Sequence, residues 1–158
     1  MRAAVLAGVM GAALVSFTAP AAMAEGDPTI TVKSNDSDTL LDMDKCAEHT
    51  DNFRFRFYYH KDYKGAWVNV GHPVWDLKYI DSGVDPAENP LRFCGDSDGG
   101  GQPAANNSAS AYNWYDQYCA YVYYSKGYGG ASERIAPHSG GNLGATANNN
   151  RSITFGKC

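Results

Sequence analysis

The ten-residue stretch Phe57-Tyr-Tyr-His-Lys-Asp-Tyr-Lys-Gly-Ala66 occurs again 65 positions later, as Val122-Tyr-Tyr-Ser-Lys-Gly-Tyr-Gly-Gly-Ala131. Six of the ten positions are identical in the two copies. A second repeated pattern follows each copy: Asn106-Asn-Ser-Ala-Ser110 after the first, and Asn148-Asn-Asn-Arg-Ser152 after the second. Two repeats in the same order indicate a duplicated supersecondary unit.

The composition favours an all-β fold, because the chain has 11 Tyr, 6 Phe, 3 Trp and 17 Gly without a long helical period. Aromatic residues suit pleated, half-buried surfaces, and glycine supplies the turns between short strands. The clearest strand is Phe53-Arg-Phe-Arg-Phe-Tyr-Tyr59, in which phenylalanine alternates with arginine. Period-two alternation predicts that the phenylalanines lie in the core and the arginines on a solvated outer face. The alternative is that the arginines form a basic stripe that binds an acidic ligand. Further strands are expected at 66–70, 119–124, 131–135 and 153–155, with a Gly/Pro-rich connection through Leu143 before the last.

The N-terminal segment predicts export. Arg2 is followed by an apolar stretch and by small residues at Ala22 and Ala24, so residues 1–24 read as a signal peptide cleaved before Glu25. The apolar stretch is too short for a membrane span. The remaining chain has 12 Lys and Arg against 17 Asp and Glu, a net charge of −5. We therefore expect a secreted, extracellular, monomeric protein that binds no nucleic acid.

The mature chain divides into an acidic extension and one domain. Residues 25–52 are polar and acidic, and residues 53–158 contain both repeats. The first unit is assigned to 53–116 and the second to 117–158. The first unit carries a loop-rich insertion at about 71–105, because the spacing between its two repeated patterns is 23 residues longer than in the second unit. Loops of this length in compact domains are usually functional or flexible.

The four cysteines, Cys46, Cys94, Cys119 and Cys158, all lie after the signal peptide. An even number in an exported protein indicates two disulfides, and the spacing does not suggest a zinc site. Four cysteines allow three pairings, which the count alone does not separate.

The patterns Tyr58-x4-Tyr63-x-Gly65 and Tyr123-x4-Tyr128-x-Gly130 resemble the hairpin signature of the βγ-crystallin superfamily. The Asn-Asn-x-x-Ser loops fall where that superfamily places its Asn/Asp-rich loop. The resemblance implies two Greek-key units packed as a βγ-crystallin-like sandwich across 53–158. In a Greek key the first and fourth strands are antiparallel neighbours, which favours Cys119–Cys158 and, for the remaining cysteines, Cys46–Cys94.

Within this superfamily the chain is similar to the secreted actinobacterial proteins grouped with the Streptomyces-type metalloproteinase inhibitors. The similarity lies in the signal peptide, the early cysteine, the Val122–Gly130 phrase and both Asn-rich loops. It implies a small disulfide-stapled protein that blocks an extracellular zinc protease.

The resemblance also implies a possible calcium site formed by the two Asn-rich loops. Their ligands would come from Asn106, Asn107, Ser110, Asn148, Asn149 and Ser152. None of these is a carboxylate, and the hairpin positions that often carry Glu in the superfamily are Tyr59 and Tyr124. Calcium affinity depends on ligand charge, so neutral ligands would bind it only weakly. We favour the alternative that the asparagines stabilise turns, and expect no required cofactor.

For protease inhibition, the sequence offers one candidate loop, Asn89-Pro-Leu-Arg-Phe-Cys94. In this hypothesis the inhibitory loop comprises Pro90, Leu91, Arg92 and Phe93: Pro90 stiffens it, Leu91 and Phe93 fill an apolar specificity pocket of the protease, and Cys94 anchors it. The favoured alternative is that Leu91 and Phe93 pack the insertion onto the sheet.

The chain lacks the GxSxG, HExxH, P-loop and dinucleotide-binding motifs, and its four histidines are scattered, so we predict no enzymatic activity. The leading hypothesis is a secreted protease inhibitor. Two alternatives stay open: a non-enzymatic βγ-crystallin-type structural or weakly calcium-binding module, and a killer-toxin-like antimicrobial protein.

Overall fold

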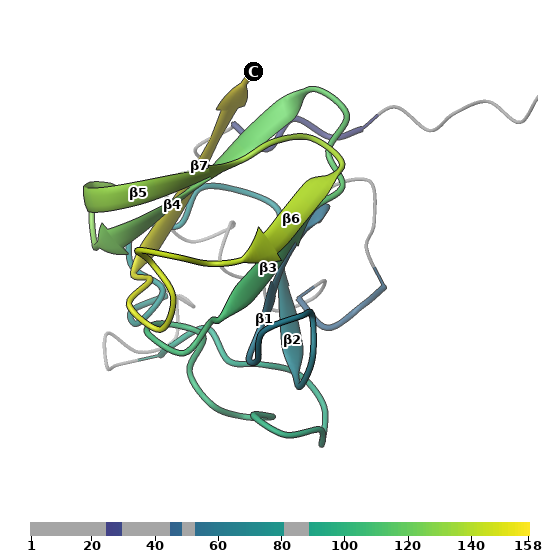
Figure 1. Ribbon diagram of the computed structural model, residues 1–158, viewed down its shortest axis with the longest axis vertical. Coiled ribbons are helices and arrows are strands. Elements are labelled where there is room, and N and C mark those ends of the chain that lie inside the picture. The colour runs from purple at the N-terminus through teal and green to yellow at the C-terminus, as the bar shows by residue number, and fades with distance from the viewer. Residues whose placement is uncertain (1–24, 30–44, 49–52, 81–88) are drawn as a thin grey trace, which may run out of the picture.

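The computed structural model describes residues 25–29, 45–48, 53–80 and 89–158. The described residues form seven strands in two antiparallel sheets and no helix (Figure 1). The predicted signal peptide lies outside the described residues, as do the parts of the acidic extension at 30–44 and 49–52. The all-β prediction is confirmed.

The strands are β1 (Phe55–Tyr58), β2 (Trp67–Val70), β3 (Ser110–Asn113), β4 (Tyr118–Ser125), β5 (Gly129–Ile135), β6 (Ser139–Asn142) and β7 (Ser152–Lys157). The first sheet has the order β2-β1-β3-β6, and the second has the order β5-β4-β7. The first and last strands of each unit are antiparallel neighbours, β1 with β3 and β4 with β7. This is the pairing that a Greek key requires.

The two units exchange their third elements. Strand β6 belongs to the second unit but pairs with β3 of the first. In the opposite direction, Val74 of the first unit forms an isolated bridge with Ile153 of β7, and the Leu77 N–H donates to the Arg151 carbonyl at 2.8 Å. The third element of the first unit is thus a single bridge rather than a strand.

The sequence did not predict β3 and β6 as strands. Strand β6 is Ser-Gly-Gly-Asn, without a large apolar side chain. Its Gly140 lies so close to β3 that a Cβ there would fall 2.3 Å from the Ala111 carbonyl oxygen. Close backbone approach, rather than side-chain burial, holds this strand in the sheet.

The core lies between the inner faces of the two sheets. The first sheet contributes Phe55, Phe57, Val68, Val70 and Ala111, and the second contributes Ala120, Val122, Ile153 and Phe155. The rings of Phe55 and Phe155 meet across the sheets with centroids 5.9 Å apart. The predicted inward direction of the phenylalanines is therefore confirmed.

The prediction of a solvated arginine face is wrong for Arg56, which is 8% exposed. Its guanidinium carbon lies 3.7 Å from the Trp67 ring centroid and 5.2 Å from that of Trp114. Its Nε donates to Asn69 Oδ1 at 2.8 Å. Two indole rings cover the cation and replace part of its hydration by cation–π contact.

Both repeated hairpins have the same backbone geometry. Gly65 and Gly130 have φ of 76° and 78°, and the tyrosines two positions earlier, Tyr63 and Tyr128, are also left-handed at 60° and 61°. In each hairpin this tyrosine packs against the one five positions before it, with ring centroids 5.4 and 5.9 Å apart. The aromatic-x4-aromatic-x-Gly signature thus encodes a folded hairpin.

The disulfides are Cys46–Cys94 and Cys119–Cys158, as predicted. The first joins the extension to the insertion, and the second joins the beginning of β4 to the end of the chain. Beside the first, the Asn69 N–H of β2 donates to the Lys45 carbonyl at 2.9 Å. Two disulfides fit an oxidising compartment. The part of the chain that the structure describes contains no candidate membrane-spanning helix.

Candidate functional site

Ser110 and Ser152, both proposed as calcium ligands, form the same pair of hydrogen bonds in their two units. Each hydroxyl accepts the N–H of the left-handed tyrosine in its own hairpin and donates to a hairpin carbonyl. In the first unit the bonds are Tyr63 N to Ser110 Oγ at 3.1 Å and Ser110 Oγ to His60 O at 2.6 Å. In the second they are Tyr128 N to Ser152 Oγ at 3.0 Å and Ser152 Oγ to Ser125 O at 2.6 Å. The serines are fully buried and fix the hairpins.

The two Asn-rich loops pair with each other across the unit boundary. The Asn106 N–H donates to the Asn150 carbonyl, and the Asn148 N–H donates to the Ser108 carbonyl, both at 2.9 Å. Asn106 and Asn148 have φ of 61° and 55°, a conformation that asparagine tolerates better than most residues.

The side chains of the next asparagines bond within their own loops. Asn107 Nδ2 donates to the Pro103 carbonyl at 2.9 Å, and Asn149 Nδ2 donates to the Ala147 carbonyl at 3.1 Å. The loop asparagines therefore stabilise turns. No group of three or more His, Cys, Asp or Glu side chains suited to a metal ion occurs in the part of the chain that the structure describes.

The two apolar side chains of the candidate inhibitory segment lie in the core rather than on the surface. Leu91 and Phe93 are 1% and 3% exposed. The backbone is paired on both sides of Arg92: the Ala104 N–H donates to the Leu91 carbonyl at 2.7 Å, and the Phe93 N–H donates to the Gln102 carbonyl at 3.0 Å. The idea that Leu91 and Phe93 enter a protease pocket is thus corrected, because burial in their own domain makes both side chains inaccessible. Pro90 is half-buried, and Arg92 is exposed.

The structure instead brings the two Asn-rich loops and the second hairpin together around a surface hollow of about 420 Å³. Its lining includes Lys78, Tyr79, Asn106, Tyr124, Lys126 and Asn149. We call it the Tyr124 hollow. Its volume lies within the range of ligand sites in proteins. Of these residues the sequence had singled out Asn106 and Asn149 as ligands and Tyr124 only as a position without the expected Glu.

The hollow exists because the two units differ around equivalent tyrosines. Tyr124 is 47% exposed. Its equivalent Tyr59 is covered by the insertion of the first unit: the Phe93 ring lies 5.6 Å away, and Gly99 is so close that a Cβ there would fall 2.2 Å from Tyr59 Cγ. The insertion therefore covers the tyrosine of the first hairpin, while that of the second stays open.

A buried carboxylate orients a cation at the edge of the hollow. Asp76 is 5% exposed, and its two oxygens accept from Arg151 Nε and Nη2 at 2.7 to 3.0 Å. Asp76 Oδ1 also accepts the Lys78 N–H at 2.9 Å. Bidentate pairing fixes the plane of the guanidinium. Arg151, which is part of the hollow, is thereby held in place.

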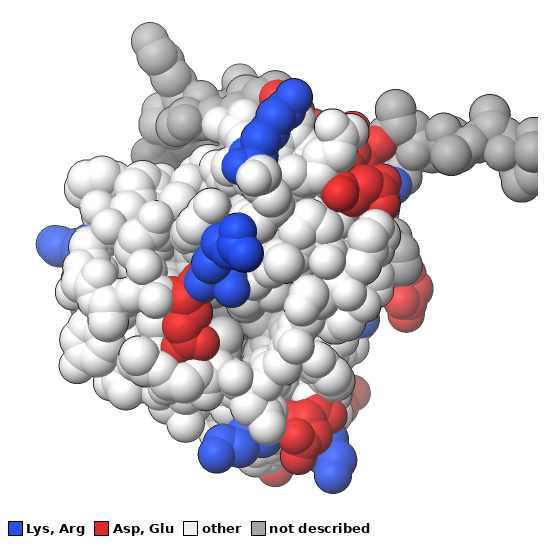
Figure 2. All heavy atoms as spheres, turned by 45° about the horizontal axis from the view of Figure 1, so that its top comes forward, with Lys and Arg blue, Asp and Glu red and all other residues white. Residues whose placement is uncertain are grey.

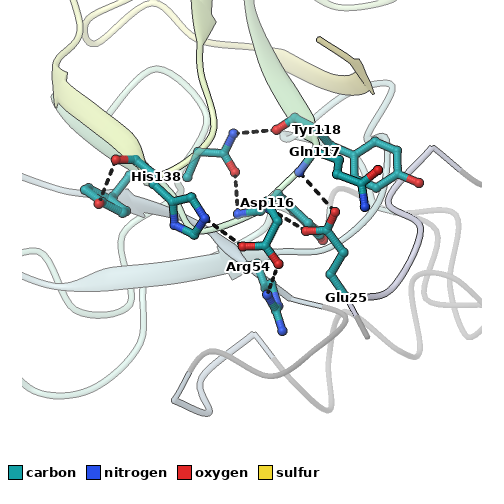
Figure 3. A network of polar contacts seen from close by, with 9 residues as sticks. Glu25, Arg54, Asp116, Gln117, Tyr118 and His138 are labelled. Carbon is teal, nitrogen blue, oxygen red and sulfur yellow. Dashed lines mark hydrogen bonds and ion pairs between the residues drawn. The ribbon is translucent and has the colours of Figure 1, made fainter. Parts of the chain in front are cut away.

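A second polar network lies at the linker between the units and includes the first residue after the predicted cleavage (Figure 3). The Glu25 carboxylate accepts the N–H groups of Asp116 and Gln117. The Asp116 carboxylate lies 2.6 Å from His138 Nε2 and 3.4 Å from Arg54 Nη1. These bonds tie Glu25 to the segment between β3 and β4 and give the network a structural role.

No protein-family model matches the chain, and no curated protein matches it. Solved structures similar to it include the following two. One, from work on the evolution of the eye-lens βγ-crystallin domain fold, has a TM-score of 0.49 and 12% identity over 71% of this chain and 93% of that chain. The other, the N-terminal domain of protein S, has a TM-score of 0.44 and 16% identity over 66% of this chain and 96% of that chain. The Greek-key assignment rests on the strand order and the two hairpins.

Proposed function

We propose that this chain is a secreted, non-enzymatic module of the βγ-crystallin type that binds an extracellular ligand at the Tyr124 hollow. The observation behind the proposal is the difference between two equivalent residues. Tyr59 is covered by the insertion, whereas Tyr124 is 47% exposed beside two lysines and two loop asparagines. An exposed aromatic side chain among convergent polar groups is typical of a binding site.

The scaffold supports this role because it holds the hollow in one conformation. Tyr124 and Lys126 belong to the hairpin that Ser152 fixes, and Asn106 and Asn149 belong to the cross-paired loops. A preformed site loses less conformational entropy when a ligand binds.

Calcium is a poor ligand for this hollow. Lys78, Lys126 and Arg151 contribute three cations, and the described lining includes no carboxylate. Cations around neutral amides repel a divalent cation and leave it without charged ligands. We therefore expect no calcium-dependent stabilisation through Asn106 and Asn149.

The finer hypothesis, inhibition of an extracellular metalloprotease, requires a surface other than 90–93, since Leu91 and Phe93 are buried. It is tested by incubating the protein at micromolar concentration with a panel of secreted zinc proteases. Inhibition that Tyr124→Ala abolishes would make the protease the ligand of the hollow. Growth tests against fungi and bacteria, which compare the protein with its Tyr124→Ala variant, address the antimicrobial alternative.

The binding proposal is tested with the mature chain, residues 25–158, with both disulfides intact. Amide NMR spectra are recorded during titration with oligosaccharides, peptides and calcium. We expect one class to shift resonances around Tyr124 and Lys126, and Tyr124→Ala to abolish the shifts. The matched control is Lys61→Ala, at the position of the first hairpin equivalent to Lys126. Shifts located only away from the hollow, or none with any class, would refute the proposal.

A further inference from the structure

We infer that the outer edge of β5 binds an extended peptide of another protein, which adds a strand to the second sheet. Strand β5 stands first in the order β5-β4-β7, so only one of its sides is paired within the sheet (Figure 1). None of its residues lines the Tyr124 hollow. The edge is therefore a second site, independent of the proposed function.

The equivalent edge in the first unit already carries added segments of this chain. That edge belongs to β2, which lies outermost in the first sheet as β5 does in the second. The Cys94 N–H donates to the Trp67 carbonyl at 2.8 Å, and the Asn69 N–H donates to the Lys45 carbonyl at 2.9 Å. The Cys46–Cys94 disulfide joins the two added segments. This edge of the fold thus accepts extended backbone.

The same backbone groups are open on β5. Ser132 and Arg134 lie 65 positions after Trp67 and Asn69, which is the offset of the repeat, so their N–H and C=O groups point away from β4. Neither backbone has a hydrogen-bond partner outside the sheet among the described residues, and both residues are exposed. Unpaired strand groups of this kind are a template for another extended chain.

The other edges of the described sheets leave less room for an added strand. Beside β2 lie the two segments of the extension and the insertion. On β7, Ile153 exchanges both backbone hydrogen bonds with Val74, at 2.9 and 3.1 Å. Strand β6 has only four residues, whereas β5 has seven. Natural proteins usually shorten or cover their sheet edges to prevent unwanted pairing. A seven-residue edge left open therefore suits a binding partner.

Arg134 gives this edge a preference for an acidic peptide. Its side chain is exposed and has no ion-pair partner among the described residues. Glu133 points to the opposite face of the strand, where its carboxylate accepts the N–H groups of Gly144 and Thr146. On the face shown in Figure 2, basic and acidic groups are scattered, with broad uncharged areas between them. An opposite charge directly across from Arg134 would form a cross-strand ion pair, so we expect Asp or Glu there in the peptide.

A small hollow at the end of the edge has room for one side chain of the peptide. Its volume is about 160 Å³, and it lies between the last residues of β5 and the segment Ser139–Leu143. Sites for whole ligands usually measure about 300–1,000 Å³. Ile135 and Leu143 contribute apolar side chains to the lining, and both are buried. We expect a small apolar residue next to the acidic one, because successive side chains of a strand point to opposite faces.

The test selects peptides on the mature chain, residues 25–158, with both disulfides intact. The probe is a displayed library of random linear heptapeptides without cysteine, and an enriched peptide is synthesised and titrated by calorimetry. Arg134→Gln, which keeps the backbone N–H, should weaken binding about two- to fivefold. Arg134→Pro should abolish it, because proline removes the outward N–H and its ring blocks the incoming strand. Tyr124→Ala, at the hollow, is the control and should leave the affinity unchanged.

Hydrogen exchange followed by NMR identifies the mode of binding, and it stays decisive if Arg134→Pro does not fold. In the free protein, the amides of Ser132 and Arg134 should exchange faster than those of Glu133 and Ile135, which bond to β4. The peptide should slow exchange at Ser132 and Arg134 by about tenfold or more. No enriched peptide, binding without protection of these two amides, or equal affinity of the wild type and Arg134→Pro would overturn the inference. A dimer of the free chain that already protects both amides would also overturn it, since a second copy would then cover the edge.

Discussion

Replacing Ser152 by alanine should destabilise the protein because it removes two hydrogen bonds. The Ser152 hydroxyl is fully buried, accepts the Tyr128 N–H at 3.0 Å and donates to the Ser125 carbonyl at 2.6 Å. Alanine removes the hydroxyl without creating a large cavity, so both backbone groups lose their partner. A buried polar group left unpaired costs about 1–3 kcal/mol. Because Tyr128 is only partly buried and water can reach some of the hairpin, we expect a total loss of about 2–4 kcal/mol.

Urea unfolding followed by tyrosine and tryptophan fluorescence, with the disulfides intact, measures this loss. At a urea slope of about 2 kcal/mol per molar, the midpoint should fall by roughly 1–2 M. The equivalent Ser110→Ala should have an effect of similar size, since that serine makes the same two bonds. Ser132→Ala, at an exposed position on β5, is the control and should change stability by less than about 0.5 kcal/mol. A loss below about 1 kcal/mol for Ser152→Ala would refute the idea that this hydroxyl fixes the hairpin.

Three further outcomes follow from burial. Leu91→Ala should lower the free energy of unfolding by about 2–5 kcal/mol in the same assay, because the side chain is 1% exposed. A nearly neutral effect would contradict the burial of this side chain. Gly99→Ala should be destabilising, since the φ of Gly99 is 92° and the added Cβ would fall 2.2 Å from Tyr59 Cγ. The matched control is Gly141→Ala, where no atom lies within 4 Å of the added Cβ, and it should cost less stability. Burial raises the pKa of Tyr115 above its ordinary value of 10.0, so the unfolded chain ionises first and the free energy of unfolding should fall as pH rises above 10.0. Urea unfolding at several alkaline pH values should show that the free energy of unfolding falls less steeply with pH in Tyr115→Phe than in the wild type. An equally steep fall in both proteins would argue against a raised pKa of Tyr115.

The repeated stretches allowed much of the fold to be predicted. Gly65 and Gly130 mark left-handed turns, and the tyrosines around them identify two folded hairpins. Alternation in 53–59 placed its phenylalanines correctly. The disulfide pairing followed from the antiparallel first and last strands of a Greek key. These features depend on local conformational preference or on topology that the repeat itself implies.

The candidate site was far less predictable. The burial of Leu91 and Phe93, the cover over Arg56 and the strand character of β6 depend on residues distant in sequence. No local pattern distinguishes an apolar side chain in an exposed loop from one that packs against a sheet. The same holds for Lys78 and Arg151, whose positions at the hollow follow from the bridge between Val74 and Ile153.

The amino-acid sequence by itself determined that this protein is a duplicated β-structure with two folded hairpins, because the residues that force each hairpin are neighbours in the chain. The tertiary structure alone decided that the two copies differ in exposure. The insertion of the first unit brings Phe93 and Gly99 over Tyr59, and no equivalent segment covers Tyr124 among the described residues. Which of two identical tyrosines is available to a ligand depends on packing between distant segments, and that packing becomes visible only when the chain is folded.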